Sequence, residues 1–306
     1  MKVVVTDRFR LPLPTGHRFP AEKYALLRQR VEASGLFRSD DFVEPDAASE
    51  ADLIRVHTPE YVRKIFAGDL TREEQNRIGF PWSPDVVERT RRTTGGTILA
   101  SRYALQEGVA VNLAGGTHHA FADRGEGFCV FNDSVVATRV LQSEGLIRRV
   151  VVIDCDVHQG NGTAALTRDD PTIFAFSIHA ANNYPQEKEQ SDLDVELPDG
   201  TGDEEYHRAL EGGLTDALSR SEADLAIYLA GADPFAGDRL GRLALTKDGL
   251  ARRDEMVFAA CAERRLPVAV TMAGGYGRDI QDTIDIHART VGIAESWSLR
   301  WGAISG

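Results

Sequence analysis

Residues 150–162, VVVIDCDVHQGNG, run from four aliphatic residues into side chains that could bind a metal. Asp154, Asp156 and His158 are spaced by two, so in extended backbone all three side chains point to one side. Carboxylates gathered in this way repel one another unless a cation lies among them. The triplet alone is equally well explained as a loop cap that binds nothing, so the other motifs of the chain decide between the two.

Three further aliphatic runs also lead into polar side chains. The run at 109 leads to His118 and His119, the run at 225 to Asp233, and the run at 268 to Tyr276. Ligands bind beyond the carboxyl ends of strands in open parallel sheets, so we expect these groups at one site. Asp233 would join the aspartate and histidine of the first motif as a third metal ligand. Three ligands with an open position are typical of a catalytic zinc site, whereas structural zinc sites are closed.

Six short aliphatic runs are expected to form the strands that hold this site. They are continuous rather than alternating, as in parallel strands covered on both faces, and they begin near residues 3, 109, 150, 172, 225 and 268. Stretches with helical spacing lie between them. The alternation predicts an α/β fold, a single three-layer α/β/α domain over residues 1–306 with a mostly parallel central sheet. The polar segment 182–206 is predicted as the longest loop and as part of the rim of the site.

The composition excludes several classes of function. The formal net charge of -12 disfavours a nucleic-acid partner, because phosphate recognition relies on clustered Lys and Arg. The three cysteines are odd in number and far apart, which predicts neither disulfides nor a CxxC metal site. A signal-peptide core and any run of about 18 apolar residues are lacking, so we expect a cytoplasmic protein without a membrane span. The sequence leaves the oligomeric state open.

Four long motifs resemble the zinc-dependent histone deacetylase family, which is related in fold to arginase. They are NLAGGTHHAFADRGEGFCVFND, VVIDCDVHQGNG, AGADPFAGDRLG and AGGYG. Their order and spacing match the family over nearly the whole chain. Within the family, Gln159 and Asn161 make the chain similar to the class IV branch, in a bacterial form. Ala273 is a departure, because many members carry a glycine at this position.

The resemblance assigns the site residues one by one. The zinc ligands, with iron(II) as an alternative metal, would be Asp156, His158 and Asp233. The catalytic set would be His118, His119, Tyr276, Asp154 and Asn161. The channel for an acyl-lysine side chain would be lined by Gly127, Phe128, Tyr184 and Leu240. A structural potassium ion would be held by Asp154, Asp156, His158, Ser177 and Ile178.

These assignments imply a hydrolase that cleaves an amide bond. His119 would act as the base for water and then as the acid for the leaving amine. Asn161 would orient His119 without stabilising its cation, whereas Asp154 would hold His118 cationic. Tyr276 would donate a hydrogen bond to the substrate carbonyl. The expected substrate is an acyl-lysine protein or peptide, with acetyl or longer fatty acyl groups.

Four alternatives accompany this interpretation. The same fold could act on acetylpolyamines or other small acylated amines. A catalytically idle acyl-lysine binding module would be expected to lack the tyrosine or a ligand, and none is missing. An arginase-like guanidine hydrolase would need further aspartates that the GTHHA segment does not supply. The GNGTAA segment at 160–165 fits a dinucleotide fingerprint, but charged residues separate it from the preceding strand.

Overall fold

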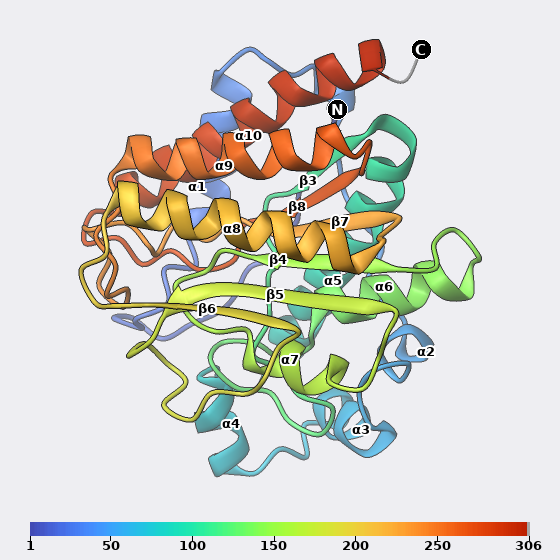
Figure 1. Cartoon of the computed structure of the whole chain (residues 1–306). Coiled ribbons are helices and arrows are strands. Elements are labelled where there is room, and N and C mark those ends of the chain that lie inside the picture. Colours follow the sequence, from blue (N-terminus) through green and yellow to red (C-terminus); the bar gives the residue numbers. More distant parts are fainter. Residues whose placement is uncertain (305–306) are drawn as a thin grey trace.

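The computed structural model describes residues 1–304, in which eight strands form one parallel sheet (Figure 1). The strand order is β2-β1-β3-β8-β7-β4-β5-β6, and every neighbouring pair is parallel. All six predicted runs form strands, which confirms the α/β fold. The strands are β1 (Lys2–Val4), β2 (Phe42–Val43), β3 (Val109–Asn112), β4 (Val150–Asp154), β5 (Ile173–Ala180), β6 (Leu193–Leu197), β7 (Leu225–Leu229) and β8 (Val268–Thr271).

Helices cover both faces of the sheet, so the described chain has three layers (Figure 1). Helices α1, α8, α9 and α10 lie on one face, and α5, α6 and α7 on the other. Within residues 1–304, no helix has both the length and the apolar character needed to cross a membrane. The helices are α1 (Lys23–Ala33), α2 (Glu50–Leu53), α3 (Pro59–Ala67), α4 (Arg72–Ile78), α5 (Pro84–Glu107), α6 (Asp133–Ser143), α7 (Asn161–Thr167), α8 (Asp203–Ser221), α9 (Lys247–Glu263) and α10 (Ile280–Ile304).

The continuous aliphatic runs contribute side chains to two hydrophobic cores, one on each face of the sheet. Val151 and Ile153 of β4 point into the core under α8, α9 and α10, while Val150 and Val152 point into the core under α5 and α6. All four side chains are fully buried. Because successive residues of a strand face opposite sides, a strand with helices on both sides must be apolar at every position. This explains why the strand residues do not alternate with polar ones.

The segment 182–206 is only partly a loop, so the prediction there is wrong. It contains β6, which pairs with β5 at the edge of the sheet, and the first turn of α8. Leu193, Val195 and Leu197 alternate with the acidic residues Asp194 and Glu196. That pattern fits an edge strand with partly exposed residues, whereas the prediction considered only continuous apolar runs. The short strand β2 at the opposite edge was also missed, because its two residues are too few to form an apolar run.

The strand order brings together the four loops that carry the predicted metal ligands and most of the predicted catalytic residues. Strands β3, β8, β7 and β4 are consecutive neighbours in the sheet, and the predicted metal ligands, both predicted catalytic histidines and Tyr276 lie in the loops after their carboxyl ends. The loops after these strands cover residues 113–132, 272–279, 230–246 and 155–160. The topology therefore brings together side chains that lie more than 150 residues apart in the sequence.

Candidate metal and catalytic site

Turns, rather than a continued strand, position the metal-binding motif. Strand β4 ends at Asp154, so Asp156 and His158 lie in the loop, and the extended geometry expected from their spacing is wrong. Asp154 Oδ1 accepts a hydrogen bond from the Asp156 amide at 3.1 Å, and Asp156 Oδ1 accepts one from the His158 amide at 2.9 Å. Aspartate commonly bonds the amide two residues on, which favours a turn over a strand. Two such turns in succession gather the three side chains.

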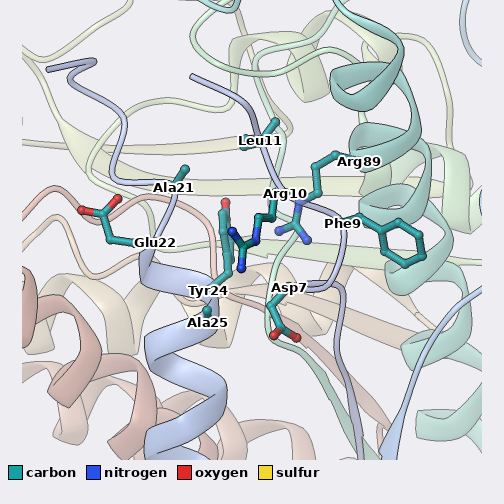
Figure 2. A pocket seen from close by; sticks show the side chains of 9 residues that line it. All are labelled: Asp7, Phe9, Arg10, Leu11, Ala21, Glu22, Tyr24, Ala25 and Arg89. Carbon is teal, nitrogen blue, oxygen red and sulfur yellow. The ribbon is translucent and has the colours of Figure 1, made fainter. Parts of the chain in front are cut away.

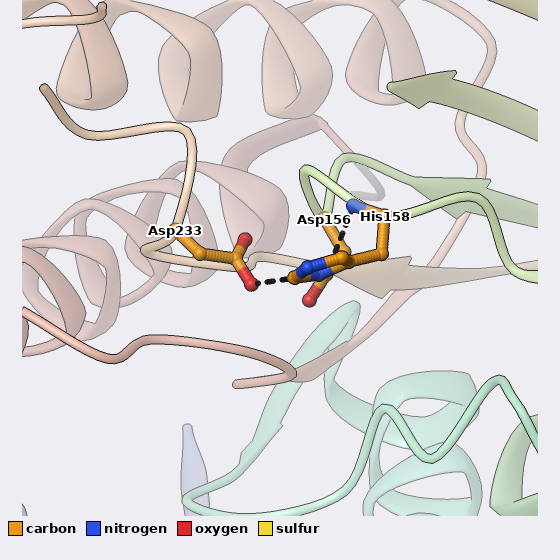
Figure 3. A group of neighbouring side chains, drawn as sticks. All are labelled: Asp156, His158 and Asp233. Atoms are coloured by element: carbon orange, nitrogen blue, oxygen red, sulfur yellow. Dashed lines mark hydrogen bonds and ion pairs between the residues drawn. The ribbon is translucent and has the colours of Figure 1, made fainter. Parts of the chain in front are cut away.

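The three predicted ligands converge on one point (Figure 3). His158 Nδ1 lies 2.9 Å from Asp156 Oδ1 and 3.4 Å from Asp233 Oδ2. One ligand atom from each residue lies within 4.8 Å of the others, and all three residues are buried. Within the described residues, Asp233 Oδ2 has no hydrogen-bond partner. One nitrogen and two carboxylate oxygens around a buried, partly unsatisfied point fit a divalent cation such as zinc or iron(II).

The protonation of this cluster supports the same fit. Burial, with the charge of Asp156 added, raises the pKa of Asp233 to about 7. Burial would lower the pKa of His158, but Asp156 and Asp233 outweigh it and raise that pKa to about 10. Two carboxylates thus hold a proton on the imidazole where a metal would bind. A divalent cation would replace that proton, since metal binding requires the neutral imidazole.

Gly274 allows the loop after β8 to close over the ligands. Its amide donates a hydrogen bond to Asp156 Oδ2 at 2.7 Å. A Cβ at this position would lie 1.9 Å from Asp233 Oδ2 and 2.6 Å from Asp156 Oδ2. Any side chain would therefore push both carboxylates out of place. The close approach of the backbone to both carboxylates therefore requires a glycine at this position.

The two predicted catalytic histidines lie side by side but have different partners. The rings of His118 and His119 are 4.1 Å apart between centroids. His118 Nδ1 lies 2.6 Å from Asp154 Oδ2, and His119 Nδ1 lies 2.7 Å from Asn161 Oδ1. Burial would lower both pKa values. Asp154 and Asp156 reverse this for His118, whose pKa rises to about 9, whereas the pKa of His119 falls well below its usual value because His118 and His158 add their charge to the burial.

Tyr276 completes the catalytic set from the loop after β8. Its backbone amide donates to Asp238 Oδ2 at 2.6 Å, and its ring lies 6.0 Å from Phe128 between centroids. Burial raises the pKa of the Tyr276 hydroxyl well above 10, and the carboxylates of Asp156 and Asp233 add to the shift. The phenol is therefore protonated at neutral pH and can donate a hydrogen bond.

Two residues near Tyr276 were not predicted as part of the site. Asp238 accepts hydrogen bonds from the amides of Leu240, Gly241 and Tyr276, and so ties two loops together. Lys23 is buried, and its ammonium donates to the carbonyl of Ala273 at 3.3 Å. Asp238 belongs to the AGADPFAGDRLG motif, which was a signal for its importance. Lys23 was not singled out, because its contact depends on a residue 250 positions away.

The predicted channel residues lie around the histidines and Tyr276. A Cβ on Gly127 would come within 2.6 Å of His119 Cδ2, so the backbone approaches the ring closely. The ring of Tyr184 stands edge-on to His119, with centroids 5.0 Å apart, and is half exposed. Leu240 is partly buried, and its carbonyl accepts a hydrogen bond from Asn183 Nδ2 at 2.6 Å. Together with Phe128 these residues contribute apolar surface beside the proposed catalytic groups.

The residues predicted for potassium lie on adjacent strands. Asp154 on β4 and Ser177 on β5 are direct neighbours in the sheet register, and Ile178 follows Ser177. Ser177 Oγ lies 2.9 Å from His179 Nδ1. These positions are compatible with a shared cation beside the backbone of Asp156 and His158. Potassium binding stays a prediction.

A separate cavity is lined by residues of the N-terminal segment and α1, together with Arg89 of α5 (Figure 2). It measures roughly 300 Å³ and contains none of the predicted catalytic residues. Arg89 is buried at its wall, stacks at 4.4 Å on the ring of Tyr24, and donates to the carbonyl of Thr6. A much smaller cavity of about 30 Å³ shares Leu11, Tyr24 and Arg89 with it and reaches Phe128. The two cavities therefore adjoin each other at these three residues.

Comparisons with known proteins agree with this geometry. The histone deacetylase domain matches residues 17–290. An uncharacterized protein of Picosynechococcus sp. is 45% identical over 94% of this chain and 95% of its own length. Histone deacetylase 2 of Arabidopsis thaliana is 33% identical over 88% of this chain and 73% of its own. The crystal structure of the HDA15 HD domain superposes with a TM-score of 0.81 at 22% identity, covering 98% of this chain and 91% of that one.

The matched domain spans most of the chain and contains every residue of the site described above. The solved structure shares the arrangement of the whole sheet and its helices. The earlier resemblance of the motifs is thereby confirmed at the level of the family. The chain belongs to the histone deacetylase family, a family of hydrolytic deacetylases.

Proposed function

We propose that this protein is a metal-dependent amidohydrolase that removes acyl groups from lysine side chains. The observation that carries the proposal is the pairing of a neutral histidine with a three-ligand metal set. His119 has a lowered pKa and a neutral amide as partner, beside the buried Asp156, His158 and Asp233. An imidazole that is neutral at physiological pH can accept a proton, which is what amide hydrolysis requires of a base.

The metal, His119 and Tyr276 would each have a separate role in the reaction. When bound, a divalent metal polarises the carbonyl and lowers the pKa of water. His119 Nε2 would take a proton from water as the water oxygen bonds to the carbonyl carbon. Tyr276 would donate a hydrogen bond to the carbonyl oxygen as negative charge develops there. When the carbon–nitrogen bond breaks, His119 would return the proton to the lysine amine, leaving a free carboxylic acid and a free lysine.

His118 would support this step without transferring the proton itself. Its pKa of about 9 keeps it cationic at neutral pH, held by Asp154. A cation beside His119 keeps the pKa of His119 low. A fixed positive charge at this point also favours the developing oxyanion. The role proposed for His118 is therefore electrostatic.

Lysine side chains are favoured over acetylpolyamines by the charges at the rim. A polyamine carries a second ammonium group, which costs several kcal/mol to bury without an anionic partner. Leu240 offers none, and the carboxylate of Glu126 beside Tyr184 is already hydrogen-bonded to Asn161 and Tyr184. A lysine stem needs only apolar walls. Acetylpolyamine hydrolysis is the second candidate and is tested beside the first.

Acyl groups longer than acetyl are also proposed as substrates. Each methylene buried in an apolar pocket could add about 0.8 kcal/mol of binding. The cavity next to Phe128 is only about 30 Å³, against roughly 300 Å³ for the larger cavity. A longer acyl chain would therefore have to shift side chains that line both cavities, such as Tyr24, to reach the larger cavity in Figure 2.

The experiment combines metal analysis with a substrate panel. Chelation should abolish activity, and zinc or iron(II) should restore it. We expect kcat/KM to be higher for acetyl, butyryl, octanoyl and myristoyl lysine peptides than for acetylated putrescine and spermidine. Full turnover after verified metal removal would refute the metal-dependent mechanism. A preference for the polyamines would favour the second candidate, and a steep fall beyond acetyl would limit the enzyme to short acyl groups.

Potassium is proposed as a second, structural ion. It would lie among Asp154 and Ser177 and the backbone carbonyls of their neighbours, where it would offset the buried carboxylate. Exchanging potassium for a large organic cation such as tetramethylammonium should lower the melting temperature. An unchanged melting temperature would argue against the site.

A further inference from the structure

We propose that Glu126 is a positioning residue for the catalytic base. Its carboxylate holds the side-chain amide of Asn161 in one of two possible orientations, and this orientation determines which nitrogen of His119 carries the proton. The inference rests on the proposed function only for the role of His119 as base. The hydrogen-bond chain itself is a feature of the structure.

The chain runs from the surface to the catalytic histidine through three side chains. Asn161 Nδ2 donates to Glu126 Oε1 at 2.7 Å, while Asn161 Oδ1 lies 2.7 Å from His119 Nδ1. The hydroxyl of Tyr184 donates to the same oxygen of Glu126 at 2.9 Å. Arg124 Nε lies 3.6 Å from the other oxygen. The side chain of Glu126 is only 12% exposed, so water weakens these contacts little.

The carboxylate of Glu126 removes the ambiguity of the asparagine amide. Turning the amide of Asn161 by half a turn would exchange its oxygen and nitrogen. The oxygen would then face Glu126 Oε1, an acceptor that cannot donate while ionised. Two acceptors 2.7 Å apart repel each other, whereas the observed orientation forms a hydrogen bond to a charged acceptor, which is among the stronger kinds.

The fixed amide in turn sets the tautomer of His119. Asn161 Oδ1 can only accept, so His119 Nδ1 must carry the proton in the neutral ring. The lone pair then lies on Nε2, on the other side of the ring. Had the amide been reversed, Nδ1 would accept from it, and Nε2 would carry the proton. That ring could not take a proton from water in the proposed reaction.

A tight turn delivers Glu126 to this position. The Cys129 amide donates to the Glu126 carbonyl at 2.9 Å, and the two residues between them, Gly127 and Phe128, have φ values of 57° and 67°. A turn with two positive φ values reverses the chain over two residues. It places Glu126 beside Asn161 and Gly127 against His119. One turn therefore places Glu126 against Asn161, the partner of the base, and Gly127 against His119, the base itself.

The first test compares two variants of Glu126 with a matched control. Glu126→Ala removes the acceptor, so we expect kcat to fall ~10-fold or more, within the 10²- to 10⁴-fold that a general base contributes. Glu126→Gln keeps an oxygen for Asn161 and should recover most of the wild-type kcat. Arg124→Ala removes the outer partner of Glu126 without touching Asn161, and its kcat should stay within about twofold of wild type.

The second test combines Glu126→Gln with Asn161→Asp. The carboxylate introduced there would be unable to donate and would repel Glu126, as two carboxylates at close range do. Glu126→Gln supplies a donor to the new carboxylate and should raise kcat relative to the single Asn161→Asp variant. The same substitution should slightly lower kcat in the wild-type background. A purely structural role for Glu126 predicts a loss in both backgrounds.

Nitrogen-15 NMR of the histidine rings provides a readout that is independent of turnover. The wild-type protein, loaded with zinc, should show His119 protonated at Nδ1, and Glu126→Ala should show a mixture of tautomers. Wild-type tautomer and wild-type kcat in Glu126→Ala would overturn the inference. Lack of acyl-lysine hydrolysis by the wild-type protein would instead refute the proposed function, and the tautomer measurement would still test the hydrogen-bond chain.

Discussion

The pair of His118 and Asp154 and the pair of His119 and Asn161 are almost the same structure with opposite electrostatics. Each imidazole is buried and uses Nδ1 to contact a side-chain oxygen at 2.6 or 2.7 Å. Yet the pKa of His118 is raised to about 9, and that of His119 is lowered well below 6.5. The partner of His118 is a carboxylate and that of His119 an amide. The chemical type of the partner, more than burial or distance, decides which histidine holds a charge.

The cationic pair also helps to define the neutral one. His118 lowers the pKa of His119 through its positive charge, after burial the largest contribution. Asp154 stabilises that charge, and in this way it indirectly lowers the pKa of His119. The two pairs thus behave as one unit, with one member charged so that its neighbour stays neutral. Substitutions that exchange or remove one member of a pair test this relationship.

Removing the neutral histidine should have the largest effect. His119→Ala eliminates the proposed base while leaving the three metal ligands in place, so kcat should fall ~10²- to 10⁴-fold. Steady-state kinetics on protein with a verified metal content measure the loss. Near-normal turnover in the metal-loaded variant would show that the neutral pair is not the base.

Removing the hydroxyl of Tyr276 should cost about 10²-fold in kcat, the usual loss for one oxyanion donor. Tyr276→Phe leaves both histidine pairs untouched, so the pH dependence of kcat/KM below neutrality should match that of wild type. The comparison of complete pH profiles measures this. A shifted acidic limb would mean that Tyr276 also affects the protonation of the histidines.

Removing the cationic histidine should cost less, about 10-fold, because it acts through its charge and transfers no proton. His118→Ala also withdraws the charge that lowers the pKa of His119, so the acidic limb of kcat/KM should move to higher pH. Asp154→Asn should shift it in the same direction by letting His118 become neutral. A larger loss than that of His119→Ala would reverse the roles assigned to the two pairs.

Converting the neutral pair into a copy of the cationic one should have the smallest effect near pH 8. Asn161→Asp places a carboxylate on His119 and raises its pKa, as Asp154 does for His118. The base must be neutral to accept a proton, so activity should be lost as the pH falls, beginning at a higher pH than in wild type. An unchanged acidic limb would show that the partner does not set the charge of His119.

The sequence predicted the covered strands and the chemistry at their ends well. Val150, Val151, Val152 and Ile153 are all apolar because helices lie on both faces of the sheet, which left a clear signal in the sequence. The strand Leu193–Leu197 was missed because its residues alternate at an exposed edge. The three ligands were found by residue type and by the family motifs, although the turn that positions Asp156 and His158 was mistaken for strand.

Contacts between distant segments could not be predicted in this way. Lys23 reaches the carbonyl of Ala273 only because α1 packs near the end of β8. Glu126 stands inside a recognised motif, but its importance depends on which atom of Asn161 faces it. Such orientations arise from the whole set of donors and acceptors in the folded protein. Spacing and residue type alone do not contain them.

The position of β8 in the middle of the sheet has a consequence for biosynthesis. It lies between β3 and β7, although it is the last of the eight strands to be made. At 5–20 residues per second, a ribosome needs roughly 8 to 32 s to proceed from the end of β3 to the end of β8. Until then β3 and β7 each have an unpaired edge, which is a template for association with other chains. We therefore expect the nascent protein to depend on chaperones until Thr271 has left the ribosome, and to become active only after this central strand has been inserted.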